Sequence, residues 1–150
     1  SAPVAAAEPQ ELAETVTFEG EALAREDTGE LKARSLFSTV TLCEFGMYTA
    51  AGDARPGGPR LLVLRFARKL SAEQMQQVFR GVVDGRSGYS TAELESFLDL
   101  LPDVKTGAIV RFRSDATGKL EVFSGDTLVG SVTAPQLAAA VWAGLGQSAE

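Results

Sequence analysis

Apolar and polar residues alternate along the first half of the chain in the manner of β-strands. Residues 15–18, TVTF, alternate with a period of two and precede a turn glycine, which predicts a short strand. The stretch 37–50, FSTVTLCEFGMYTA, is rich in Val, Thr, Phe and Tyr and contains no proline, which predicts a long strand. Residues 60–67, RLLVLRFA, are apolar on both faces apart from Arg65, so we expect a central strand covered on both sides.

Charged and turn-forming residues separate these strands. The charged stretch 24–34, AREDTGELKAR, is predicted to form a hairpin with its tip at residues 27–29, because Asp-Thr-Gly favours a turn. Residues 52–59, GDARPGGP, combine two prolines with three glycines and are predicted to form a loop.

Two helices are predicted in the middle of the chain by their caps and by apolar residues at helical spacing. A capping box from Ser71 to Gln74 begins the first helix. A second capping box, from Ser90 to Glu93, begins the next helix, which stops before Pro102.

The last third of the chain predicts a meander and a final helix. Residues 108–113, 119–123 and 127–132 are short strand patterns separated by hairpin turns. Thr133 is predicted to cap the last helix. The order of elements predicts an α+β fold in which helices pack on one face of an antiparallel sheet.

The length of 150 residues fits one domain, which we place at residues 14–147 after a disordered lead-in at residues 1–13. The lead-in begins SAPVAAAEPQ, without Met. It fits a mature chain whose signal peptide has been removed, which predicts a periplasmic or secreted protein. It equally fits a domain boundary, which leaves a cytoplasmic location open.

Composition excludes several classes of function. The formal charge is −6 and no basic run occurs, so nucleic acid and anionic membrane surfaces are poor partners. No apolar run is long enough to predict a transmembrane segment. Histidine is absent, which excludes Ser-His-Asp, Cys-His and zinc-hydrolase chemistry, and we expect neither a metal nor a cofactor.

Three segments resemble the chalcone isomerase-like family, in particular its small bacterial members. The motifs are GELKAR leading to FGMY at residues 45–48, LVLRF leading to LSAE and FRG at residues 79–81, and FSGDTLVG leading to VWAGLG at residues 141–146. Together they span residues 14–147. The resemblance implies an open-faced β-sandwich with a cleft between the sheet and the helices.

Catalytic members of that family close a chalcone to a flavanone in this cleft. The resemblance places Arg34 at the position of the arginine that polarises the carbonyl. It places Cys43 at the position of a threonine, Met75 near that of a tyrosine, and Val82 near that of an asparagine. Because Cys, Met and Val are weak or absent hydrogen-bond partners, the resemblance implies a non-catalytic member.

An apolar cleft with one arginine suits a small hydrophobic or amphipathic carboxylate, the kind of ligand that plant fatty-acid-binding relatives of this fold take. Arginine pairs bidentately with a carboxylate, and each buried methylene contributes about 0.8 kcal/mol. The candidate ligand-binding residues are Arg34, Cys43, Tyr48, Arg65, Met75 and Phe79.

Each of these residues also has a structural interpretation. Cys43 is expected to fill the core, since a lone thiol without histidine has no activating partner. Arg65 is expected to form an ion pair, with Glu44 as the partner on an adjacent strand. Arg34 fits a solvated turn residue, and Tyr48 fits an anchor at the edge of the core. Met75 and Phe79, on the apolar face of a helix, fit core residues.

Two other functions stay open beside ligand binding. An isomerase or lyase would use Arg34 as its electrophile and bound water for proton transfer. An accessory protein would fill the cleft with its own side chains.

Overall fold

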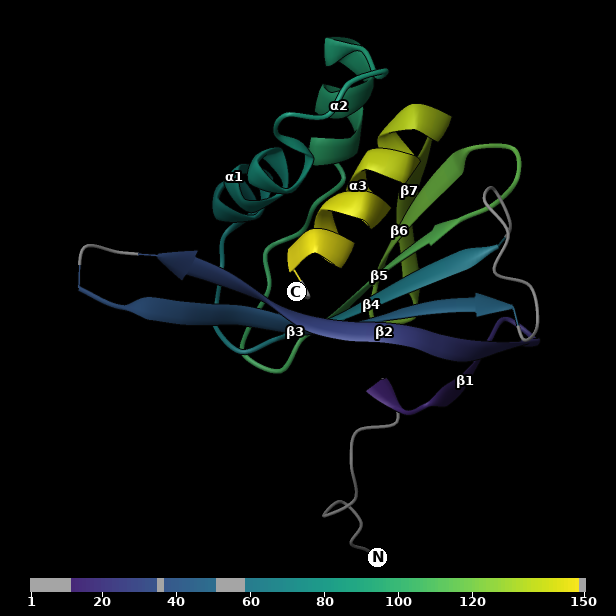
Figure 1. The fold of residues 1–150 in the computed structure, drawn as a ribbon, viewed down its shortest axis with the longest axis horizontal. Coiled ribbons are helices and arrows are strands. Elements are labelled where there is room, and N and C mark those ends of the chain that lie inside the picture. The colour runs from purple at the N-terminus through teal and green to yellow at the C-terminus, as the bar shows by residue number, and fades with distance from the viewer. Residues whose placement is uncertain (1–11, 35–36, 51–58, 149–150) are drawn as a thin grey trace, which may run out of the picture.

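The computed structural model describes residues 12–34, 37–50 and 59–148 (Figure 1). The predicted loop at residues 52–59, apart from Pro59, and most of the predicted lead-in lie outside this part of the chain. The strands are β1 (Thr15–Phe18), β2 (Glu21–Arg34), β3 (Thr39–Ala50), β4 (Arg60–Phe66), β5 (Ile109–Ser114), β6 (Lys119–Ser124) and β7 (Thr127–Thr133). The helices are α1 (Ala72–Val83), α2 (Thr91–Leu98) and α3 (Pro135–Ser148).

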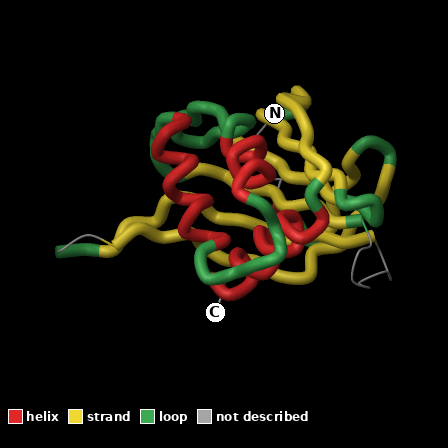
Figure 2. The backbone as a smooth tube through the Cα atoms, turned by 90° about the horizontal axis from the view of Figure 1, so that it is seen from above, coloured by secondary structure: helices red, strands yellow, loops and turns green. Residues whose placement is uncertain are grey.

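All seven strands form one antiparallel sheet in chain order, from β1 at one edge to β7 at the other. The three helices lie together over one face of this sheet (Figure 2). The predicted α+β architecture is therefore confirmed. None of these helices is long and apolar enough to cross a membrane.

The caps that the sequence predicts for α1 and α2 are present. The Ser71 side chain accepts a hydrogen bond from the Gln74 amide at 3.1 Å, and the Gln74 side chain accepts one from the Ser71 amide at 2.9 Å. Ser90 and Glu93 make the same reciprocal pair at the start of α2. Each pair satisfies two amides that a helix start leaves without an intrahelical acceptor.

The hairpin predicted within residues 24–34 is wrong, because β2 runs continuously to Arg34. It pairs with β3 along this length, from Leu23 opposite Ala50 to Arg34 opposite Thr39. The long partner strand β3 supplies hydrogen-bond donors and acceptors along this length. A β-bulge at Glu26 accommodates the shift in register between Arg25 and Asp27. The Asp-Thr-Gly turn signal was therefore overridden by pairing.

The last helix also begins later than predicted. β7 includes Thr133, and α3 starts at Pro135, whose fixed φ suits the first helical position.

The two faces of the sheet have different cores. The helix side holds the larger cluster, which contains three aromatic rings packed edge to face, Phe79, Phe97 and Phe112, at centroid distances of 5.2 to 6.0 Å. The opposite face holds a small buried cluster, Leu23, Tyr48, Leu61 and Val63, drawn from strands alone.

Candidate functional site

The residues predicted to line the middle of the cleft are closed into the helix-side core. Cys43, Met75 and Phe79 are each 0% exposed and belong to one cluster. Burial raises the pKa of the Cys43 thiol from its ordinary 9.0 to about 12, so the thiol stays protonated at neutral pH. The structure thus brings these residues together as packing, with no nucleophile among them.

Tyr48 and Arg65 lie on the opposite face of the sheet, which corrects the prediction that all the candidate residues line one cleft. The Tyr48 hydroxyl donates to the Ala13 carbonyl at 2.7 Å. Arg65 forms an ion pair with Glu44, directly across from it on β3, as the structural interpretation expected. Side chains alternate along a strand, so Tyr48 points away from the face that its neighbour Met47 shares with the helices.

Arg34 is the last residue of β2 and its side chain is exposed. The residues just before it, Leu31, Lys32 and Ala33, line a groove beside α1, but Arg34 is not among the lining residues. The predicted anchor and the predicted apolar wall are therefore separate in the structure.

A groove of about 400 Å³ lies between α1 and the strands β2 and β3. Its apolar walls are Leu31 and Leu42 from the strands and Val78 and Val82 from the helix, with Ala33 and Gly81 beside them. The polar residues among those that line it are Lys32 and Gln77. A volume of this size falls within the range of small-molecule sites, roughly 300–1,000 Å³.

A β-bulge shapes the strand side of this groove. Leu31 pairs with Cys43 and Lys32 pairs with Thr41, so Leu42 is the extra residue between them. Bulges re-aim side chains, and here Leu42 and Cys43 both join the helix-side cluster although they are adjacent in sequence. The pairing of β3 with β4 begins only at Cys43, so the outer part of β2 and β3 extends as a two-stranded ribbon (Figure 1).

Gly81 keeps the helix side of the groove open. A Cβ added to Gly81 would meet no atom within 4 Å, whereas one added to Gly144 of α3 would lie 2.1 Å from the Val82 carbonyl oxygen. Gly144 is thus explained by close contact between α1 and α3. Gly81 has no such packing reason, although a helical glycine costs about 0.5–1 kcal/mol relative to alanine. The space it leaves belongs to the groove.

Lys32 is the positively charged residue among those that line the groove. Its Nζ lies 3.6 Å from a Glu30 carboxylate oxygen, with side-chain exposures of 53% and 45%. Such an exposed pair contributes about 0–1 kcal/mol, so the ammonium can readily exchange Glu30 for a bound anion. An apolar groove with a cation among its lining residues is suited to hold an amphipathic anion.

Among the described residues that line the groove, no acid is paired with a base. Its ionisable lining residue is Lys32, with the neutral Gln77 amide nearby. No group of His, Cys, Asp and Glu that could hold a metal ion occurs in the described residues. A second hollow of about 230 Å³, between β2 and α3, is lined by Glu26 and Asp27, whose charge opposes a carboxylate.

Sequence reasoning missed most of the residues that make this groove, although the resemblance had singled out Val82. Leu31 and Lys32 fell in the stretch interpreted as a hairpin, and Leu42 was hidden by the bulge. Gly81 carried a readable signal, since a glycine inside an amphipathic helix indicates a special local requirement.

The antiparallel sheet with helices on one face is the open-faced chalcone isomerase-like fold. Among solved structures, the chain is similar to the fatty-acid binding protein AtFAP1 of Arabidopsis thaliana, with a TM-score of 0.67 and 17% sequence identity. The match covers 86% of this chain and 87% of that chain. No family model matches the sequence, and no curated protein matches it. The predicted resemblance is confirmed at the level of the fold.

Proposed function

We propose that this protein is a non-catalytic binding protein for a hydrophobic or amphipathic carboxylate, whose apolar chain lies in the groove between α1 and the β2–β3 ribbon. The observation that carries the proposal is an apolar groove that Gly81 leaves open, with Lys32 among its lining residues. The fatty-acid binding named for the structural neighbour supports the same ligand class.

The energetics favour the apolar part of the ligand. Each methylene buried against Leu31, Leu42, Val78 or Val82 contributes about 0.8 kcal/mol. A charge-assisted contact with an exposed lysine contributes less than a few methylenes do. Affinity should therefore rise with chain length until the groove is filled, and the carboxylate mainly orients the ligand.

An isomerase or lyase is less well supported. The positions that the family resemblance assigns to water-holding side chains are Cys43 and Met75, both fully buried and both poor donors. Arg34, the electrophile of that hypothesis, is exposed at the strand end. If the absorbance of a chalcone decays no faster with the protein than in buffer, this alternative is excluded.

The binding proposal is tested by filling the groove from Gly81. Saturated carboxylates of eight to sixteen carbons are titrated calorimetrically into the wild type and into Gly81→Leu. Leucine is a good helix former, so the variant should fold while its side chain occupies the groove. We expect affinity to fall at least about tenfold, the equivalent of two or more methylenes.

Controls separate blocking from unfolding. Glu73→Leu places the same side chain at an exposed position of α1 outside the groove, and it should bind like the wild type. Lys32→Met keeps an apolar stem and should reduce only the preference for the acid over its alcohol. Wild-type affinity in a folded Gly81→Leu variant would overturn the proposal, as would the absence of binding to every chain length.

A further inference from the structure

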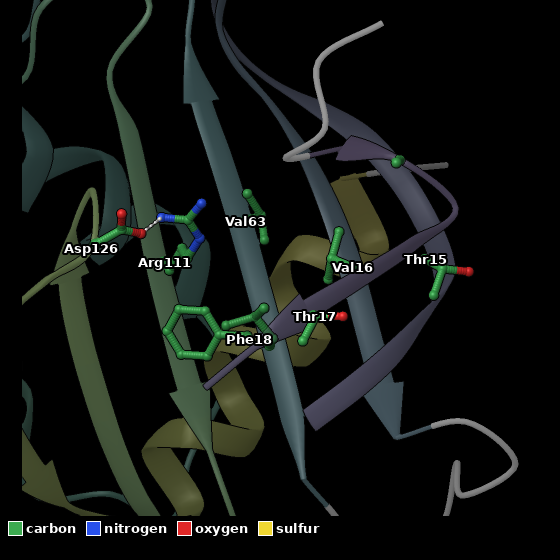
Figure 3. Close-up of a pocket in the computed structure, with 9 residues that line it drawn as sticks. Thr15, Val16, Thr17, Phe18, Val63, Arg111 and Asp126 are labelled. Carbon is green, nitrogen blue, oxygen red and sulfur yellow. Dashed lines mark hydrogen bonds and ion pairs between the residues drawn. The ribbon is translucent and has the colours of Figure 1, made fainter. Parts of the chain in front are cut away.

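A cavity of about 520 Å³ lies on the face of the sheet that the helices leave uncovered (Figure 3). β1 pairs with β2 at one edge of the sheet, yet the Phe18 ring packs edge to face on Phe123 of β6 at a centroid distance of 5.0 Å. The sheet therefore curls strongly, and β1 closes over β4 and β5. The apolar walls of the enclosed space come from Val16, Phe18, Leu61 and Val63.

Arg111 of β5 is the cationic side chain that lines this cavity. It is only 15% exposed, and its guanidinium lies 5.7 Å from the centroid of the Phe18 ring. Its Nη1 donates to the Gly125 carbonyl at 2.6 Å and to an Asp126 carboxylate oxygen at 3.4 Å. The Asp126 side chain is 98% exposed, so it compensates the guanidinium charge weakly.

Arg113, two residues along the same strand, is an arginine whose charge is compensated by carboxylates. It pairs with both Glu19 and Glu121. These carboxylates raise the pKa of the Arg113 guanidinium, although desolvation opposes them. Arg111 has one distant carboxylate where Arg113 has two close ones.

The free edge of the Arg111 guanidinium has the geometry that carboxylates prefer. Within the described residues, the hydrogen bonds of this side chain all come from Nη1. The opposite edge, formed by Nε and Nη2, carries two parallel N–H groups that match the two oxygens of a carboxylate. Figure 3 shows the guanidinium between Asp126 and Val63, with the Phe18 ring below it in this view.

We propose that this cavity is a second binding site, separate from the groove, for a small monocarboxylate with a compact apolar body. The carboxylate pairs with the Nε and Nη2 edge of Arg111, and the apolar body packs on Phe18 and Val63. Asp126 lies near the anion and weakens its binding.

The test uses 4-phenylbutyrate and its uncharged amide, titrated into the full chain and followed by NMR. The acid should bind, and the amide at least about tenfold more weakly, because charge-assisted bidentate pairs are strong. Arg111→Gln should weaken binding of the acid by the same factor. Asp126→Asn should tighten binding of the acid a few-fold, because it removes a like charge at an exposed position.

Gly81→Leu, which fills the groove, should leave 4-phenylbutyrate binding unchanged, so failure here is distinguishable from failure of the proposed function. Equal affinity for acid and amide would overturn the proposal, as would the absence of binding at millimolar concentrations. Loss of binding in Gly81→Leu would assign the probe to the groove and would also overturn it. If Arg111→Gln fails to fold, the acid-to-amide ratio and Asp126→Asn still decide.

Discussion

The two faces of the sheet are covered in different ways. On the helix side, α1, α2 and α3 cover the strands, and the buried rings of Phe79, Phe97 and Phe112 pack edge to face. On the other face, β1 is the element of the described chain that folds over the strands, and a cavity with partly buried charge remains beneath it. The helix layer leaves space at its margins, beside Gly81 and between β2 and α3.

This difference teaches where ligands can enter this fold. A well-packed core behaves like a crystal and admits nothing without rearrangement, so a binding site needs a place where packing stops. The helix layer stops at the edge of α1, where the β2–β3 ribbon extends beyond it (Figure 1). Under the thin cover of β1, the packing leaves a space that Arg111 lines.

The largest predicted effect on stability tests directly whether the two faces are packed differently. Phe79→Ala should lower the free energy of unfolding by about 3–5 kcal/mol, because a fully buried ring leaves a cavity in a closed core. Phe18→Ala, on the open face, should cost about 1–2 kcal/mol, because the half-buried ring already borders a cavity. Urea denaturation measures both.

Phe37→Ala is the reference for this pair, since the Phe37 side chain is 95% exposed and its removal should change stability by less than about 0.5 kcal/mol. Equal losses for Phe79→Ala and Phe18→Ala would show that the two faces are packed alike, and the comparison would fail.

A smaller effect at alkaline pH tests whether the centre of the helix side is dry. The Cys43 pKa is raised from 9.0 to about 12 in the folded protein, so the stability contributed by the neutral thiol is complete below pH 9 and is lost between pH 9 and 12. At pH 11 the loss should be about 3 kcal/mol relative to Cys43→Ala, measured by denaturation of both proteins across this range.

Identical pH profiles for the wild type and Cys43→Ala would mean that the thiol ionises freely and that water reaches the centre of the helix side. That result would restore the cleft that the sequence predicted beside Cys43.

Much of the fold could be predicted because its signals are local. The capping boxes at Ser71 and Ser90 specify helix starts by hydrogen bonds within four residues, and both are present. The Asp-Thr-Gly signal at residues 27–29 is local too, but its outcome depended on β3, a long partner that pairs with it throughout. Tertiary pairing overrides turn propensity in such a case.

The site was harder to predict, because it depends on which face a side chain takes. The run LLVLRFA is apolar at nearly every position, so its pattern does not reveal that Arg65 points away from the helices. The bulge at Leu42 shifts the alternation of side chains by one residue, and no turn-forming residue in the sequence indicates this shift. In β5, by contrast, Val110 and Phe112 alternate with Arg111, and this pattern does place the arginine on the helix-free face.

The most direct test of the central claim is a methyl NMR spectrum of the wild type titrated with dodecanoate. If dodecanoate binds in the groove, the methyl resonances of its wall residues should shift together and saturate. These residues are Leu31, Leu42, Val78 and Val82. If dodecanoate leaves all four unchanged up to its solubility limit, the groove beside Gly81 is not a ligand site and the proposed function is wrong.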